Sequence, residues 1–177
     1  MDLVVLYGGV TGNSEAIAHL IGAQAEDKPH LFSRVRLQCM RDVASLDELD
    51  DASGLAVIVS STTGDGDQPQ DAQPFLQRVL GRAKLLSSFR FALLGLGDSN
   101  YSAFCQGPKV IYQALVDRGA KAILPPGWAD DGIGLEVVVE PWIDRLWEAV
   151  SNLPISTTSF ITSKGLFLFT LLTLLLV

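Results

Sequence analysis

Hydrophobic residues along the chain form two patterns that alternate as far as about residue 150. Short, nearly continuous apolar runs predict buried strands, which we place at 2–7, 33–38, 55–60, 89–95 and 121–124. Stretches with apolar residues three and four positions apart predict helices near 12–25, 70–82, 106–118 and 135–150. Strands and helices that follow each other in turn predict an α/β fold, a doubly wound five-stranded parallel sheet. We interpret residues 42–54 as a polar connection with a short helix.

The composition changes after Leu153 and divides the chain into three parts. We expect one folded domain over 1–153, a Ser/Thr-rich linker at 154–164 and a hydrophobic tail at 165–177. A membrane-spanning helix needs about 20 apolar residues, whereas the uncharged tail has 13. Three interpretations of the tail stay open: a short C-terminal anchor, an interfacial or sticky segment, and the product of an altered transcript.

Charge and cysteine content narrow the functional classes. Residues 1–153 carry 12 basic and all 20 acidic residues, a net charge of −8. Nucleic-acid binding needs clustered Lys and Arg, so this balance argues against it. Acidity suits a basic partner protein or serves only solubility. Cys39 and Cys105 form no CxxC pair, and we expect no signal peptide, so the reduced cytoplasm is the expected compartment.

Three loops rich in Gly, Ser, Thr and Asp each follow the carboxyl end of a predicted strand. Their sequences are GGVTGNS (8–14), SSTTGDGDQP (60–69) and LGLGDSNYSAF (94–104). In open α/β sheets, ligands bind in the crevice outside the carboxyl ends of the strands. We therefore expect the three loops to form one ligand site.

The first loop has the features of an anion site. A sharp turn from a strand into a helix presents free backbone N–H groups, and Thr11, Asn13 and Ser14 add side-chain donors. The loop is neither GxGxxG nor a nucleotide P-loop, because no Lys follows Gly12. We expect one phosphate group held mainly by hydrogen bonds. The alternative is an ordinary helix N-cap, a position that Asn and Ser favour.

The third loop adds two aromatic residues, Tyr101 and Phe104, to a polar stretch outside any predicted strand. An exposed aromatic ring beside a ligand site can stack on a planar ligand. The alternative is that Tyr101 packs beneath its own loop. With a phosphate loop on the same edge of the sheet, a flat, phosphorylated ligand accounts better for the three loops together.

Four segments of the chain, in this order, resemble the FMN-binding, flavodoxin-like domain of the diflavin reductases. They are YGGVTGNSEAIA, SSTTGDGD, GLGDSNYSAFC and ADDGIGLEVVVEPWIDRLW, and the resemblance covers about residues 2–150. Within this family the chain is most similar to the methionine synthase reductases, above all through the last segment. The resemblance implies a flavodoxin-like fold, FMN as the cofactor and single-electron transfer as the activity.

The resemblance also implies a role for each loop. The first holds the FMN 5′-phosphate, the second borders the isoalloxazine ring, and the third carries the stacking residue Tyr101. The carbonyl of Gly64 would accept a hydrogen bond from the reduced flavin N5–H. Asp131, with Asp130 beside it, matches an acidic residue that supports electron transfer. The implied cofactor-binding residues are Gly9, Val10, Thr11, Gly12, Asn13, Ser14, Ser61, Thr62, Thr63, Gly64, Leu96, Gly97, Asp98, Ser99, Asn100, Tyr101, Phe104, Cys105 and Asp131.

Two positions depart from the pattern of many relatives and leave the FMN affinity open. Gly9 stands where many relatives have Ser or Thr, so one phosphate donor is missing. Thr63 stands where cytochrome P450 reductases have a Tyr that stacks on the second flavin face, although methionine synthase reductases also have Thr there.

The remaining candidate residues have competing interpretations. Asp130, Asp131, Glu136 and Glu140 form an acidic group that suits a docking face for a redox partner or a plain solvated face better than a metal site, because no His accompanies them. Trp142 and Trp147 are expected to pack the last helix. Cys105 is expected to line the third loop and not to act as a nucleophile, because no base lies near it in sequence.

Two functional hypotheses follow. In the first, the chain is an FMN-binding electron-transfer module, and the resemblance implies a cobalamin-dependent methionine synthase as acceptor. The FAD- and NADPH-binding half that would supply electrons has no counterpart before Val177, so we expect no turnover by this chain alone. In the second, the chain is a truncated, non-redox flavodoxin-fold product with weak or no FMN binding, which is regulatory, membrane-tethered or without function. A phosphate-ester enzyme would lack a nucleophile and base.

Overall fold

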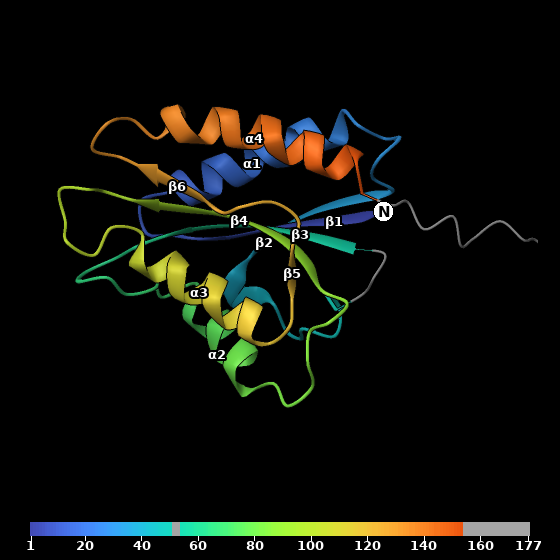
Figure 1. Ribbon diagram of the computed structural model, residues 1–177, viewed down its shortest axis with the longest axis horizontal. Coiled ribbons are helices and arrows are strands. Elements are labelled where there is room, and N and C mark those ends of the chain that lie inside the picture. Colours follow the sequence, from blue (N-terminus) through green and yellow to red (C-terminus); the bar gives the residue numbers. More distant parts are fainter. Residues whose placement is uncertain (51–53, 154–177) are drawn as a thin grey trace, which may run out of the picture.

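A parallel sheet forms the centre of the computed structural model, which describes residues 1–50 and 54–153 (Figure 1). Its strand order is β2-β1-β3-β4-β5, with β6 also paired to β4, and all pairs are parallel. The strands are β1 (Asp2–Gly8), β2 (Arg34–Cys39), β3 (Gly54–Ser61), β4 (Arg90–Gly97), β5 (Lys121–Ala122) and β6 (Gly127–Asp130). The predicted doubly wound parallel sheet is confirmed.

Helices cover both faces of this sheet. One face carries α1 (Asn13–Glu26) and α4 (Glu136–Ser151), and the other carries α2 (Gln73–Gly81) and α3 (Gln106–Asp117) (Figure 1). Each helix pair closes its own apolar core, one of which contains Ile21 and Trp142 and the other Phe75 and Ile111. Because β1, β3 and β4 are buried on both faces, their sequences are nearly continuous apolar runs.

The last predicted strand is interrupted. We expected one strand at 121–124, but β5 covers only two residues and β6 resumes beside the same neighbour, β4. Pro125 and Pro126 lie between them. Proline has no N–H to give to a ladder, so the pairing stops there and begins again at Gly127. This second piece carries Asp130 to the carboxyl edge of the sheet.

The connection after β2 differs in detail from the prediction. The short helix is a 3₁₀ turn, η1 (Met40–Asp42), at the start of the connection. Beyond it, Val43, Leu46 and Leu49 are buried in the core, and they anchor an otherwise polar segment to the domain. The predicted linker at 154–164 and tail at 165–177 lie outside the described residues and stay predictions. Within the part of the chain that the structure describes, no helix has the length and apolar character needed to cross a membrane.

Candidate functional site

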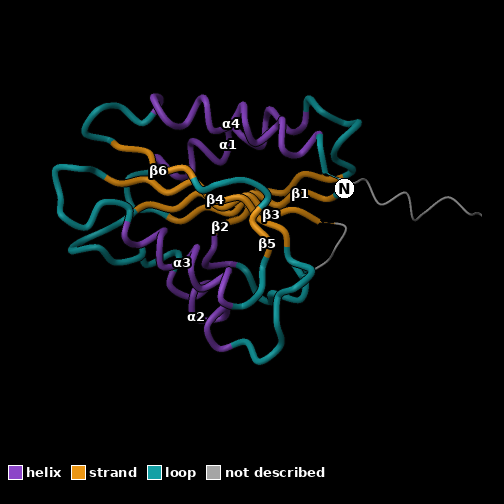
Figure 2. Tube along the Cα trace, viewed as in Figure 1, coloured by secondary structure: helices purple, strands orange, loops and turns teal. Residues whose placement is uncertain are grey.

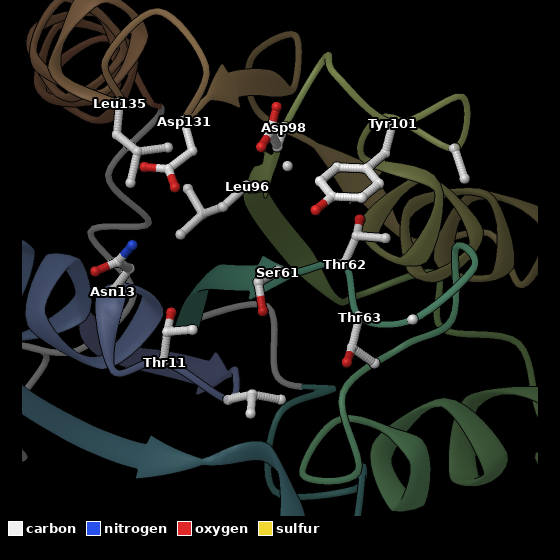
Figure 3. Close-up of a pocket in the computed structure, with 14 residues that line it drawn as sticks. Thr11, Asn13, Ser61, Thr62, Thr63, Leu96, Asp98, Tyr101, Asp131 and Leu135 are labelled. Carbon is white, nitrogen blue, oxygen red and sulfur yellow. The ribbon is translucent and has the colours of Figure 1, made fainter.

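A pocket of ≈ 420 Å³ opens at the carboxyl edge of the sheet, where the loops after β1, β3, β4 and β6 gather at the left of Figure 2. Its volume lies within the range of about 300–1,000 Å³ that is usual for small-ligand sites. All three predicted loops contribute to its wall (Figure 3). The site therefore forms where the strand ends of an open α/β sheet place it.

Most of the predicted cofactor-binding residues line this pocket. They are Val10, Thr11, Asn13, Ser61, Thr62, Thr63, Gly64, Leu96, Gly97, Asp98, Tyr101 and Asp131. The predicted residues that do not line it are Gly9, Gly12, Ser14, Ser99, Asn100, Phe104 and Cys105. Two lining residues, Ala103 and Leu135, were missed by the sequence analysis. Leu135 follows β6, so a correct interpretation of the divided fifth strand would have drawn attention to its loop.

The first loop ends in a backbone conformation that only glycine adopts easily. Gly12 is the residue that precedes α1, its φ is 88°, and its carbonyl accepts the Ala16 N–H at 2.9 Å. No side chain among the described residues caps this helix start. The alternative of an N-cap by Asn13 or Ser14 is therefore wrong, and the first N–H groups of α1 keep the anion-binding character of an uncapped helix end.

A buried hydroxyl lies directly behind this loop. Ser14 is 1% exposed, and its Oγ has no hydrogen-bond partner among the described residues. A Cβ atom at Gly9 would lie 2.8 Å from Ser14 Oγ and 3.2 Å from Ser61 Oγ, so the two hydroxyls stand close to the Gly9 backbone. An unsatisfied buried hydroxyl costs about 1–3 kcal/mol. A phosphate oxygen at the loop would supply the missing partner, so these residues fit a phosphate-bearing cofactor.

The second loop is closed by its own backbone. Thr63 and Asp67 exchange two N–H···O bonds, each of 2.9 Å. The turn between them needs a positive φ of 52° at Gly64, which borders the pocket. A Cβ atom at Gly66 would lie 2.9 Å from the Cβ of Ala103, so the second loop packs closely on the third.

Tyr101 does not pack beneath its own loop, so that alternative is wrong. The residue is 69% exposed and lines the pocket, while its backbone N–H donates to the Asp98 carbonyl at 3.1 Å. Phe104 behaves differently. Its ring lies 5.4 Å from Lys109 Nζ, which also donates a 2.7 Å hydrogen bond to the Phe104 carbonyl. Of the two aromatic residues, only Tyr101 is placed to stack on a ligand in the pocket.

Two adjacent carboxylates, those of Asp130 and Asp131, lie at the end of β6, and their surroundings differ. Asp131 is exposed and lines the pocket, and its N–H donates to the Gly97 carbonyl at 2.8 Å. Asp130 is only 9% exposed, and its Oδ1 accepts N–H bonds from Ser99 at 2.9 Å and Gly132 at 3.0 Å. Hydrogen bonds from Ser99, and then from Gly132, hold the pKa of Asp130 below its usual value.

The arrangement of the other acidic and thiol groups does not suit metal binding or covalent chemistry. Among the described residues, no cluster of three His, Cys, Asp or Glu side chains is placed to hold a metal ion. Burial raises the pKa of the Cys105 thiol to about 12, so this thiol stays protonated and is a poor nucleophile. Its Sγ lies 3.7 Å from the carbonyl oxygens of Gly95 and Ala129, between β4 and β6.

The fold and the pocket define a class of protein. A doubly wound parallel sheet presents an uncapped helix start, hydroxyl-rich loops and an exposed aromatic ring to a flat, phosphorylated ligand. A model of the flavodoxin family matches residues 5–142, and the chain belongs to this family. Family and fold together indicate that the ligand is FMN.

Similar proteins agree with this assignment. The chain is 42% identical to methionine synthase reductase of Mus musculus over 152 residues, which is 84% of the chain but 21% of that protein. It is 34% identical to NADPH-dependent diflavin oxidoreductase 1 of Mus musculus over 154 residues, covering 84% of the chain and 25% of that protein. The chain thus spans about a fifth to a quarter of the length of these relatives.

A solved structure supports the fold. A mutant of flavodoxin from Pseudomonas aeruginosa superposes with a TM-score of 0.70 at 24% sequence identity. The match covers 85% of this chain and 99% of the flavodoxin.

Proposed function

We propose that this FMN-binding module transfers single electrons to a partner protein. The observation that carries the proposal is the pocket itself, which joins phosphate-binding features to an exposed Tyr101. Bound FMN can accept and donate electrons one at a time, and the protein supplies binding, orientation and electrostatics.

Each loop then has its own role in binding the cofactor. Thr11, Asn13 and Ser14, with the N–H groups that begin α1, would hold the phosphate. Tyr101 would stack against the ring, and Leu135 lies across the pocket from it (Figure 3). The Gly64 loop would border the ring edge.

The pocket is acidic where it meets the ring site. Asp98 and Asp131 line it, and no Lys or Arg is among the described residues of its wall. A carboxylate close to the ring opposes the gain of negative charge there and thereby lowers the reduction potential of the site. We assign Asp131 this electrostatic task, because its side chain is exposed in the pocket (Figure 3), whereas Asp98 Oδ1 already accepts the Asn100 N–H at 2.8 Å.

For the partner, the similarity to methionine synthase reductases supports a cobalamin-dependent methionine synthase as electron acceptor, which would place the chain in methionine biosynthesis. A basic docking face on the acceptor would suit the acidic pocket rim. The electron donor would be a reductase half on another polypeptide or another segment. Cys39 and Cys105 are both free thiols, which supports the cytoplasm as compartment.

A non-redox, flavodoxin-fold role with weak FMN binding is the second candidate, and Gly9 and Thr63 favour it. Gly9 offers no hydroxyl, and Thr63 offers no second aromatic ring to the pocket. The packing around Gly9 weakens the argument from the missing hydroxyl. A side chain there would collide with Ser14 Oγ, so Ser14 and Ser61 already occupy the space around the missing hydroxyl.

The deciding experiment is the visible absorption spectrum of the full chain after incubation with excess FMN and desalting. We expect flavin bands at about one equivalent per chain, followed by stepwise uptake of electrons in a reductive titration. Retained flavin that takes up no electrons would exclude the redox role. A colourless protein with a folded circular dichroism spectrum would favour the non-redox candidate.

A further inference from the structure

The buried carboxylate of Asp130 joins two loops that are distant in sequence. Its Oδ1 accepts the Ser99 N–H from the third loop at 2.9 Å and the Gly132 N–H from the loop after β6 at 3.0 Å. Asp130 does not line the pocket and is 9% exposed. One oxygen atom thus connects the two segments that close the pocket on the side of β4 and β6.

The junction around this oxygen is tightly packed. A Cβ atom at Gly132 would lie 3.1 Å from Asp98 Oδ1, 3.1 Å from Asn100 Nδ2 and 3.2 Å from Asp130 Oδ1. Asp98 Oδ1 also accepts the Asn100 N–H at 2.8 Å, which folds the third loop back on itself. The loop after β6 therefore lies directly against the third loop, with little space for movement between them.

The two neighbours of this junction both reach the pocket. Tyr101 lies two residues after Ser99, and Asp131 lies one residue before Gly132. At the end of a strand, adjacent side chains point to opposite sides, so the pair Asp130–Asp131 places one carboxylate inside the protein and the other in the pocket.

We propose that Asp130 is a positioning residue, whose carboxylate fixes the Tyr101 loop against the Asp131 loop before any ligand binds. This inference rests on the proposed FMN site. A carboxylate forms stronger bonds to N–H groups than a neutral acceptor does, roughly twice as strong. Loops that are already ordered lose less conformational freedom on binding, so the preformed junction favours affinity. The lowered pKa of Asp130 agrees with an ionised side chain at neutral pH.

The test begins with the FMN-free full chain, in which amide hydrogen exchange is measured at Ser99, Gly132 and Tyr101. We expect Asp130→Ala to accelerate exchange at all three amides by about tenfold or more, a loss of protection that corresponds to local opening. The matched control, Asp144→Ala, removes an exposed carboxylate from α4 and should leave these amides unchanged. Faster exchange at Ser99 and Gly132 without any change at Tyr101 would overturn the positioning role.

The second measurement is a double-mutant cycle on the dissociation constant of FMN. We expect Asp130→Ala to weaken FMN binding about tenfold, and the penalty of Tyr101→Ala to shrink in that background, because coupled residues are not additive. Strictly additive effects would show that Asp130 supports only general stability and would overturn the proposal. Asp130→Asn keeps an oxygen acceptor, should recover part of both effects, and serves the same measurements if the alanine variant does not fold.

The two proposals fail in different ways. If the wild-type chain does not bind FMN, the proposed function fails, while exchange at Tyr101 in the FMN-free protein still decides the role of Asp130. If FMN binds and all three amides exchange at the wild-type rate in Asp130→Ala, the positioning role alone fails.

Discussion

The first and third loops of the pocket are built in opposite ways. The first has polar groups without protein partners among the described residues, namely the uncapped start of α1 and the hydroxyl of Ser14. The third is held by protein hydrogen bonds to Asp98 and Asp130, and yet presents Tyr101 in the open. Under the proposed function, the ligand would therefore complete the first loop, whereas protein contacts already order the third. Variants in the two loops should therefore affect the ligand-free protein differently.

The largest effect is expected at the exposed ring. Tyr101→Ala should weaken FMN binding by about 1–3 kcal/mol through lost stacking and burial. The stability of the ligand-free protein should hardly change, because the ring is 69% exposed. Fluorescence titration with FMN and urea unfolding measure the two quantities.

Ile133→Ala is the matched control for this variant. Ile133 is 65% exposed but does not line the pocket, so its loss should leave the dissociation constant unchanged. An unchanged constant in Tyr101→Ala would remove Tyr101 from the site.

In the first loop, Ser14→Ala should move affinity and stability in opposite directions. FMN binding should weaken by about 1–2 kcal/mol, because a hydrogen bond to a charged phosphate is lost. The ligand-free protein should keep its stability or gain up to about 1 kcal/mol, since an unsatisfied buried hydroxyl disappears. Chemical unfolding with and without FMN separates the two effects.

Ser60→Ala provides the comparison for Ser14. Ser60 is also fully buried, but its Oγ donates to the Ser61 carbonyl at 3.5 Å, and it lies in β3, outside the first loop. Its loss should leave FMN affinity unchanged. Equal losses of stability in both serine variants would show that Ser14 has a protein partner and that the two loops do not differ in this respect.

Asp131→Asn should alter electron transfer more than cofactor affinity. The change removes one charge from the pocket wall and keeps the size of the side chain, so binding should shift by less than about 0.5 kcal/mol, as usual for exposed positions. The reduction potential should rise, because less negative charge opposes reduction. Potentiometric titration and stopped-flow reduction measure these effects, and equal changes in affinity and rate would argue against an electrostatic task.

The smallest effect concerns pH and distinguishes the two loops in the absence of ligand. The pKa of Asp130 is lower in the folded protein than its usual value of 3.8. Its contribution to stability is therefore complete above pH 3.8 and is lost as the pH falls through the folded-state pKa. Asp130→Asn should flatten the acid end of the stability curve measured by urea unfolding, whereas Ser14→Ala should leave its shape unchanged. If the free energy of unfolding falls equally steeply at acid pH in the wild type and in Asp130→Asn, this prediction is contradicted.

The sequence predicted the regular elements well, because hydrophobic periodicity records burial directly. The runs at β1, β3 and β4 are apolar since both of their faces are covered, and the carboxyl ends of parallel strands place the three loops together. The divided last strand was missed, because four residues of β6 after Pro125 and Pro126 make too short a pattern to recognise.

Within the site, the types of residue could be predicted from the sequence, but the direction of each side chain could not. Phe104 and Tyr101 are both aromatic residues of one polar loop, yet only Tyr101 lines the pocket, because Phe104 lies beside Lys109. Likewise, nothing in the adjacent pair Asp130–Asp131 shows from sequence which carboxylate is buried. That difference depends on the pairing of β6 with β4, which is a long-range contact.

The late position of Asp130 in the chain has a consequence for biosynthesis. The first loop and Tyr101 leave the ribosome well before β6, whose pairing with β4 brings Asp130 to Ser99. Chains grow from the N-terminus, and a segment can pair only with residues that have already emerged. A nascent chain that stops short of Gly132 therefore has the first loop and Tyr101, but not the junction that holds the Tyr101 loop against the loop after β6. If Asp130 positions the Tyr101 loop as proposed, tight FMN binding requires that the folded domain be nearly complete.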